Sequence, residues 1–99
     1  MYYVYVLLQN NGNLYTGSTD NLKRRFKDHE QGKVVSTKYN RPVKLILYEG
    51  YLFEKDAKRR EKYLKTSDGK RDIKRQLSYA FKQLSIHRNI EHINNGGFA

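Results

Sequence analysis

The segment 14–29 constrains this chain most, because it changes from strand to helix within a few residues. It begins with strand-forming residues, turns at Gly17 and Ser18, and continues with a helical pattern. Thr19 and Asp20 are the N-cap candidates for that helix, since Ser, Thr, Asp and Asn are the usual N-cap residues. The segment therefore predicts a strand followed directly by a surface helix.

The helix in this segment has two polar side chains toward its inner face. Leu22 and Phe26 share an apolar stripe on the helical wheel, and Arg25 and His29 fall on or beside that stripe. An arginine and a histidine that face the core need polar partners, because unpaired buried charge is costly. The pattern is a first indication of a functional site.

The residues before this segment predict a hairpin. Residues 2–8 form an apolar and aromatic run typical of a central strand, and a turn signal follows it. A two-residue turn would put Tyr5 and Tyr15 on opposite faces of the sheet. A three-residue turn, with Gly12 left-handed in a bulge, pairs Tyr5 with Gly17 and puts both tyrosines on one face. We predict the three-residue turn.

The rest of the chain predicts a small α+β domain with a three-stranded antiparallel sheet flanked by about three helices. Residues 1–85 are expected to form this single domain, and residues 86–99 a tail with at most a short helix before disorder. The remaining expected elements are a helix stop with Gly32 left-handed, a basic loop at 33–42, a strand at 43–49 ending at Gly50, a helix over 54–64, and a third helix capped by 66–69 and continuing to Leu84.

The helix expected over 54–64 contains a second anomaly. Glu61 falls within an apolar stripe formed by Phe53, Ala57 and Leu64, on a helix that is otherwise basic. The structural alternative is an ion pair with Arg60 or Arg25, or a side chain that reaches the edge of the stripe. A carboxylate in this position is equally consistent with a functional role.

Charge and composition limit the function. The 99-residue chain has 20 Lys and Arg against 10 Asp and Glu, a net charge of +10 that favours a polyanionic partner, usually nucleic acid. The absence of cysteine excludes disulfides and cysteine-based zinc sites. Neither a signal peptide nor an apolar run of roughly 20 residues is present, so we expect a cytoplasmic protein without a membrane segment.

Taken together and in this order, these residues resemble a known family. Tyr3-Val4-Tyr5, Tyr15-Thr16-Gly17, Arg25, His29 and Glu61 are similar to the motifs of the GIY-YIG endonuclease domain. The resemblance is closest to its small stand-alone members, which are similar to the N-terminal domain of excinuclease C, and it spans about residues 1–82. The chain departs from the pattern at spacer positions, with Tyr-Val for Gly-Ile and Thr for Ile.

The resemblance implies metal-dependent hydrolysis of a phosphodiester bond. Glu61 would hold one Mg²⁺ or Mn²⁺, and Arg25 would bind the scissile phosphate with its fork of donors. Tyr5 would act as general base and Tyr15 would orient the water or phosphate, although these roles could be exchanged. Nearby cations would have to help Tyr5 accept a proton, because the ordinary pKa of tyrosine is about 10. His29 would relay a proton or fix Tyr5.

The expected function is therefore a DNA endonuclease that acts in repair or on branched structures. DNA is preferred to RNA as the partner, and a further protein or a second copy could supply specificity. The alternatives are a nucleic-acid-binding module with little or no cleavage and a small RNA- or ribosome-associated protein. The expected nucleic-acid contacts are Gly17, Lys33, Lys38, Arg41 and Lys44, and the alternative for the four basic residues is a solvated basic surface.

Overall fold

The computed structural model describes residues 1–84, so the expected tail over 86–99 lies outside the described residues. Residues 78–84 are helical and follow α3 after a break at Leu77. The elements in chain order are β1 (Tyr2–Leu8), β2 (Leu14–Thr19), α1 (Leu22–Glu30), the short 3-10 helix η1 (Lys38–Asn40), β3 (Lys44–Tyr51), α2 (Glu54–Leu64) and α3 (Ser67–Gln76).

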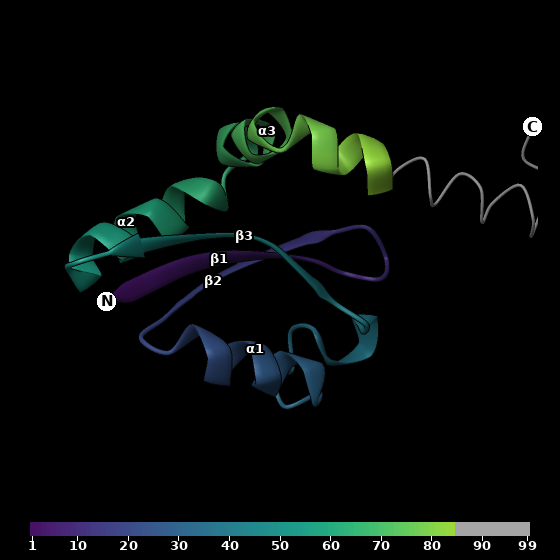
Figure 1. Ribbon diagram of the computed structural model, residues 1–99, viewed down its shortest axis with the longest axis horizontal. Coiled ribbons are helices and arrows are strands. Elements are labelled where there is room, and N and C mark those ends of the chain that lie inside the picture. Colours follow the sequence, from purple (N-terminus) through teal and green to yellow (C-terminus); the bar gives the residue numbers. More distant parts are fainter. Residues whose placement is uncertain (85–99) are drawn as a thin grey trace, which may run out of the picture.

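The three strands form one antiparallel sheet in the order β2-β1-β3, with α1 on one face and α2 and α3 on the other (Figure 1). Side chains alternate between the faces of a strand, so β1 contributes to two cores. One core contains Val4, Val6, Ala57, Leu64 and Ile73, and the other contains Tyr5, Leu7 and Val43. The predicted α+β class and the central position of the first strand are confirmed.

The hairpin has the predicted three-residue turn. Tyr5 pairs with Gly17, and Leu7 pairs with Tyr15. The amide of Gly12 donates to the Gln9 carbonyl at 2.9 Å, and Gly12 has a φ of 89°, which an L side chain rarely adopts. This register places Tyr5 and Tyr15 on the face covered by α1.

The predicted N-cap of α1 is wrong. Asn21 caps the helix, because its side-chain oxygen accepts the Arg24 amide at 3.0 Å. Thr19 still belongs to β2, and its hydroxyl oxygen accepts the Asn21 amide at 3.1 Å. Asp20 instead forms an exposed ion pair with Arg24. The strand therefore extends two residues closer to the helix than a turn at Gly17 suggested.

Three further expectations need correction. Phe53 is 64% exposed, because it is the extended N-cap of α2 and lies outside the helical stripe. Strand β3 continues to Tyr51, since Gly50 pairs with Tyr3 across the sheet. The third helix is interrupted at Leu77, although Thr66 caps its start as predicted. Gly32 is left-handed at the end of α1, also as predicted.

Within the described residues, each helix is too short or too polar to cross a membrane.

Candidate active site

The site begins where Tyr5 crosses the edge strand β2. A Cβ atom added to Gly17 would lie 2.6 Å from the Tyr5 hydroxyl oxygen and 2.7 Å from Cζ. Glycine thus allows the phenol to pass over β2, which forms one edge of the sheet. Gly17 is itself buried and makes room for Tyr5, and the nucleic-acid contact expected of it from the sequence stays a prediction.

Behind Tyr5 lies a buried chain of polar groups. The Tyr5 hydroxyl is 2.8 Å from His29 Nε2, and His29 Nδ1 is 2.8 Å from the Thr37 hydroxyl oxygen. His29 and Thr37 are both fully buried. The Tyr15 ring meets the His29 ring edge to face, with centroids 5.1 Å apart. Burial, helped by the charge of Arg25, lowers the pKa of His29 to about 4, so the ring is neutral near pH 7.

Arg25 lies one turn before His29 on α1 and approaches both tyrosines. The nearby Tyr5 hydroxyl raises the pKa of Arg25, and Tyr15 contributes in the same direction. Burial raises the pKa of Tyr5 to about 12, although the Arg25 guanidinium beside the hydroxyl acts in the opposite direction. The phenol is therefore protonated at neutral pH, and a further positive charge is required before it could ionise.

Glu61 approaches the site from the other face of the sheet. Its carboxylate accepts the Ser18 hydroxyl at 2.6 Å and contacts Lys65 Nζ at 2.9 Å and Lys58 Nζ at 3.7 Å. Burial raises the pKa of Glu61, but the hydrogen bonds from Ser18 and Lys65 and the lysine charges outweigh it. The pKa is therefore held below its usual range. The carboxylate is ionised at neutral pH.

In the part of the chain that the structure describes, Glu61 does not form the ion pair with Arg60 or Arg25 that was the structural alternative. Arg60 binds Glu49 with two contacts of 2.9 Å and 3.2 Å, and Arg25 lies with the tyrosines. Lys58 of α2 and Lys65 at its C-cap pair with Glu61 instead. They lie three residues before and four residues after Glu61, on the same helical face. The partners of Glu61 are therefore lysines and not the arginines that the structural alternative named.

The five predicted residues lie around the edge strand β2. Tyr5 and Tyr15 lie on the α1 face with ring centroids 6.3 Å apart, next to Arg25 and His29. Successive residues of a strand point to opposite faces, so Ser18, which follows Gly17, turns toward α2 and holds Glu61. The charge of Glu61, on the other face, makes a small contribution to the raised pKa of Tyr5. Sequence reasoning missed Ser18 and Thr37, which have no motif of their own.

The four basic residues predicted to contact nucleic acid differ in what their side chains bind. Lys33, Lys38 and Lys44 are exposed. Arg41 instead donates to the carbonyls of Lys38 at 3.0 Å and Glu30 at 3.1 Å. Arg41 thus ties the loop after α1 to the end of that helix, while the three lysines keep their charge toward solvent.

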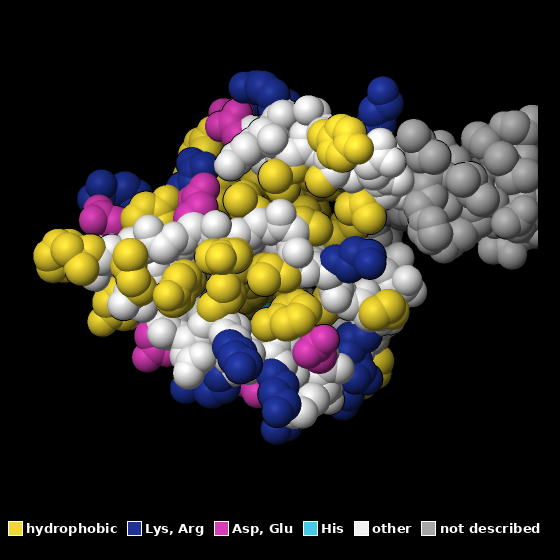
Figure 2. Space-filling model, viewed as in Figure 1, with side chains coloured by type: hydrophobic (Ala, Val, Ile, Leu, Met, Phe, Trp, Pro, Cys, Tyr) yellow, Lys and Arg dark blue, Asp and Glu magenta, His cyan; other side chains and the backbone are white. Residues whose placement is uncertain are grey.

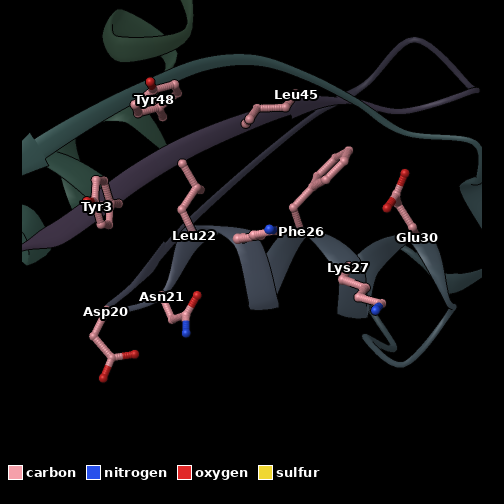
Figure 3. Close-up of a pocket in the computed structure, with 10 residues that line it drawn as sticks. Tyr3, Asp20, Asn21, Leu22, Phe26, Lys27, Glu30, Leu45 and Tyr48 are labelled. Carbon is pink, nitrogen blue, oxygen red and sulfur yellow. The ribbon is translucent and has the colours of Figure 1, made fainter.

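A hollow of about 710 Å³ lies elsewhere, between α1 and strands β1 and β3 (Figure 3). Its floor is apolar, and Figure 2 shows hydrophobic side chains gathered along the strands on this face. None of the five predicted site residues lines it. The lining side chains in Figure 3 include Tyr3, Leu22, Phe26, Leu45 and Tyr48. The β2 edge is the better candidate site, because the five predicted residues lie around it and none of them lines this hollow.

Metal binding at the β2 edge would depend on one carboxylate. Within residues 1–84, no group of three or more His, Cys, Asp and Glu side chains is arranged to hold a metal ion. Glu61 is nevertheless ionised and presents hard oxygen donors, which suit a hydrated Mg²⁺ or Mn²⁺. The donor chemistry therefore fits one hydrated ion and not a site enclosed by protein ligands.

This fold, with paired hairpin tyrosines, an inward arginine and histidine, and a glutamate at one sheet edge, is that of a GIY-YIG type domain. The chain belongs to the GIY-YIG family, whose model, the GIY-YIG catalytic domain, matches residues 1–75. The predicted resemblance is confirmed. The family is one of nuclease domains, which implies that this domain binds nucleic acid.

The chain is similar to stand-alone UPF0213 proteins. It is 34% identical over 93 residues to a UPF0213 protein of Clostridium perfringens, covering 91% of this chain and 98% of the relative. A UPF0213 protein of Limosilactobacillus reuteri is 36% identical, covering 89% and 95%. The solution NMR structure of a UPF0213 protein from Bacillus halodurans has a TM-score of 0.51 and 31% identity, covering 78% of this chain and 86% of that one.

Proposed function

We propose that the protein is a divalent-metal-dependent endonuclease that hydrolyses phosphodiester bonds in DNA, with its catalytic unit within residues 1–85. The observation that supports this most is the meeting of a phenol, a guanidinium and an ionised carboxylate around β2. These groups are Tyr5, Arg25 and Glu61. They supply a proton acceptor, a phosphate clamp and a cation ligand, which are the parts that phosphodiester hydrolysis needs.

Arg25 would bind the scissile phosphate. A guanidinium presents a planar fork of donors that matches two phosphate oxygens, and it keeps its charge at any physiological pH. Its position beside Tyr5 and Tyr15 would bring the phosphate to the two phenols. The clamp would also neutralise charge that builds on the phosphoryl group during the attack.

Tyr5 would accept a proton from the attacking water, and Tyr15 would orient the water or the phosphate. The raised pKa of Tyr5 means that the free protein holds this phenol protonated. Positive charge brought to Glu61 would favour the phenolate, since an opposite charge nearby stabilises an ionised group. The same positive charge would cancel the effect of Glu61, which raises the pKa of Tyr5.

Glu61 would hold the metal ion. When bound, Mg²⁺ or Mn²⁺ supplies Lewis-acid stabilisation of the phosphoryl and leaving oxygens. The ammonium of Lys65 competes for the same carboxylate, and its side chain is 56% exposed, so it is free to turn toward solvent or phosphate. Ser18 would keep the carboxylate in position in both states.

Lys33, Lys38 and Lys44 would contact phosphates without reading sequence, and the net charge of +10 would draw the protein to DNA in preference to neutral partners. Repair and the processing of branched structures are the proposed settings. A partner protein or a second copy could add specificity.

Nicking of supercoiled plasmid with Mg²⁺ or Mn²⁺ tests the proposal. We expect Glu61→Gln and Arg25→Ala to lower the nicking rate by about 10²-fold or more, by analogy with the loss of one oxyanion donor. Asp56→Asn is the matched control, because Asp56 lies on the outer face of α2 and pairs with Arg59. If both site variants nick at the wild-type rate, catalysis by this site is wrong.

A binding module without cleavage is the second candidate. The observation that favours it is the protonated state of Tyr5 at neutral pH. Filter binding to labelled DNA and RNA, with and without Mg²⁺, separates the two functions. Salt-sensitive binding without nicking on flapped, forked and single-stranded substrates would support the module.

A further inference from the structure

Tyr39 is the most exposed of the large hydrophobic side chains in residues 1–84. It belongs to the short helix η1 in the basic loop after α1, and 83% of its surface is open to solvent. A single exposed apolar side chain is common on proteins, so its surroundings decide whether it has a role. Two features of these surroundings, a fixed backbone and a concentration of positive charge, point to a ligand.

The backbone that carries Tyr39 is held in place by buried and loop contacts. Thr37, two residues earlier, is fully buried, and its hydroxyl oxygen is 2.8 Å from His29 Nδ1. The Asn40 carbonyl, one residue later, accepts the Asn10 amide at 2.9 Å, which joins η1 to the turn between β1 and β2 (Figure 1). The loop would have to break these contacts to bury Tyr39. The ring is therefore presented to solvent on a fixed base.

The surroundings of the ring are positively charged. Residues 33–42 include Lys33, Lys38 and Arg41 and no acidic residue. The Lys38 ammonium lies over the Tyr39 ring, 5.4 Å from its centroid, which is within the range of a cation–π contact. An exposed ring beside cations suits a nucleotide, because the base can stack on the ring while its phosphate pairs with the lysine.

We propose that Tyr39 is a stacking platform for an unpaired base of the DNA substrate, with Lys38 beside it to bind the adjoining phosphate. Bases within an intact duplex stack on one another, so the occupant is a base in a single strand, an overhang or a gap. This inference rests on the proposed function and names its substrate class, DNA that has an unpaired nucleotide.

The platform lies close to the proposed catalytic residues. Thr37 contacts His29, and the Cα atoms of Thr37 and Tyr39 are at most about 7.6 Å apart, since two trans peptide units separate them. A base on Tyr39 would therefore be near the nucleotides that reach the site. Tyr39 selects the substrate and takes no part in the chemical step.

Tryptophan fluorescence reports the stacking directly. The chain contains no tryptophan, so Tyr39→Trp in the full chain places a single indole at this position. We expect a short oligothymidylate to quench its emission, because a stacked base quenches indole. An abasic strand of the same length should bind through its phosphates and leave the emission nearly unchanged.

Tyr79→Trp is the matched control, because Tyr79 is 75% exposed in the helical segment that follows α3. We expect oligothymidylate to quench it much less than Tyr39→Trp. No quenching of Tyr39→Trp by oligothymidylate would overturn the proposal. Equal quenching by the abasic strand, or equal quenching at the two positions, would overturn it as well.

Binding measurements separate stacking from charge. Tyr39→Ala should weaken the binding of oligothymidylate by about fivefold or more, the value of one stacked base, and Tyr39→Phe should keep the wild-type affinity. The slope of log K against log salt should stay the same in Tyr39→Ala, because no phosphate contact is lost. An unchanged affinity, or an equal loss of affinity for the abasic strand, would contradict the proposal.

Nicking rates distinguish this inference from the proposed function. We expect the wild type to cut gapped or overhanging DNA faster than intact duplex, and Tyr39→Ala to lose that preference. A protein that cuts all of these at one rate, with or without Tyr39, would contradict the stacking role and leave the nuclease function standing. Base-dependent quenching of Tyr39→Trp, together with a wild type that nicks no substrate, would support the stacking role and count against the nuclease function.

Discussion

At the scale of single residues, the site depends on the absence of a Cβ atom at Gly17. The Tyr5 ring occupies the space that any other side chain at position 17 would need. Gly50 is another strand glycine, but a Cβ there would be 3.5 Å from its nearest neighbour, an ordinary contact. Gly17 and Gly50 therefore allow a controlled comparison, because a Cβ atom would clash at the first position and fit at the second.

Gly17→Ala should displace Tyr5 and disturb both folding and the site. Overpacking of a buried position typically costs about 1 to 3 kcal/mol, and we expect a loss in that range in the free energy of unfolding. Gly50→Ala should change it by no more than about 0.5 kcal/mol. Urea unfolding followed by circular dichroism gives both values. Equal effects of the two substitutions would show that the Tyr5 contact is not what constrains position 17.

At the scale of elements, α1 is held at both ends by polar groups. Asn21 caps its start, and His29 near its end connects it to β1 through Tyr5 and to the following loop through Thr37. Arg41 adds hydrogen bonds from that loop to the helix end. The polar groups of the site therefore also keep α1 on the sheet.

Asn21→Ala should destabilise the protein by about 1 kcal/mol, the usual cost of losing an N-cap side chain. Asp20→Ala is the control, because its exposed ion pair with Arg24 adds little. Thermal unfolding at one pH compares them. A larger loss for Asp20→Ala than for Asn21→Ala would mean that the cap assignment is mistaken.

The neutral state of His29 predicts how stability depends on pH. Its pKa is lowered from 6.5 to about 4 in the folded protein, so below 6.5 the unfolded chain binds a proton that the folded protein does not. Stability is complete above pH 6.5 and is lost as the pH falls toward 4, by on the order of 2 to 3 kcal/mol. Glu49 and Glu61 have lowered pKa values and lose their contributions only below about their ordinary 4.5.

Urea unfolding between pH 7 and pH 4.5 measures the effect of His29. The His87→Gln/His92→Gln variant is the control and should show the same dependence as the wild type, since it retains His29. Constant stability across this range would contradict a neutral buried His29.

At the scale of the whole molecule, positive charge is spread over both sides of the sheet. Lys33 and Lys38 lie in the loop that follows α1, and Lys70 and Lys74 lie on α3, on the opposite face. The proposed site lies near the first pair, because Thr37 of the same loop binds His29. The loop lysines should therefore contribute more to DNA binding than the α3 lysines.

Lys33→Ala/Lys38→Ala should reduce the slope of log K against log salt by about 0.9 for each phosphate that the protein no longer neutralises. Lys70→Ala/Lys74→Ala removes the same charge from the other face and should leave the slope closer to the wild-type value. Fluorescence anisotropy with duplex DNA over a salt series provides the slopes. A larger effect of Lys70→Ala/Lys74→Ala would contradict this prediction and would place the DNA-binding surface on the α3 face.

Much of this molecule could be predicted from local patterns. The three-residue turn, the left-handed Gly12 and Gly32, and the bounds of α2 depend on turn chemistry and periodicity within a few neighbouring residues. The family motifs named the five site residues in the same way, and the structure brings them to one sheet edge. The cap of α1 was missed, because three candidate cap residues in a row, Thr19, Asp20 and Asn21, can be separated only by where β2 ends.

The sequence by itself thus determined the order of the elements, the register of the first hairpin and the types of residue at the site. Only the tertiary structure decided which groups they meet. Ser18 reaches Glu61 across 43 positions of chain, and Tyr5 reaches His29 across 24. Such contacts depend on how the helices pack on the two faces of the sheet, which no short pattern encodes. The tertiary structure also buries Tyr5, and this burial raises its pKa. It likewise brings the buried Thr37 to His29.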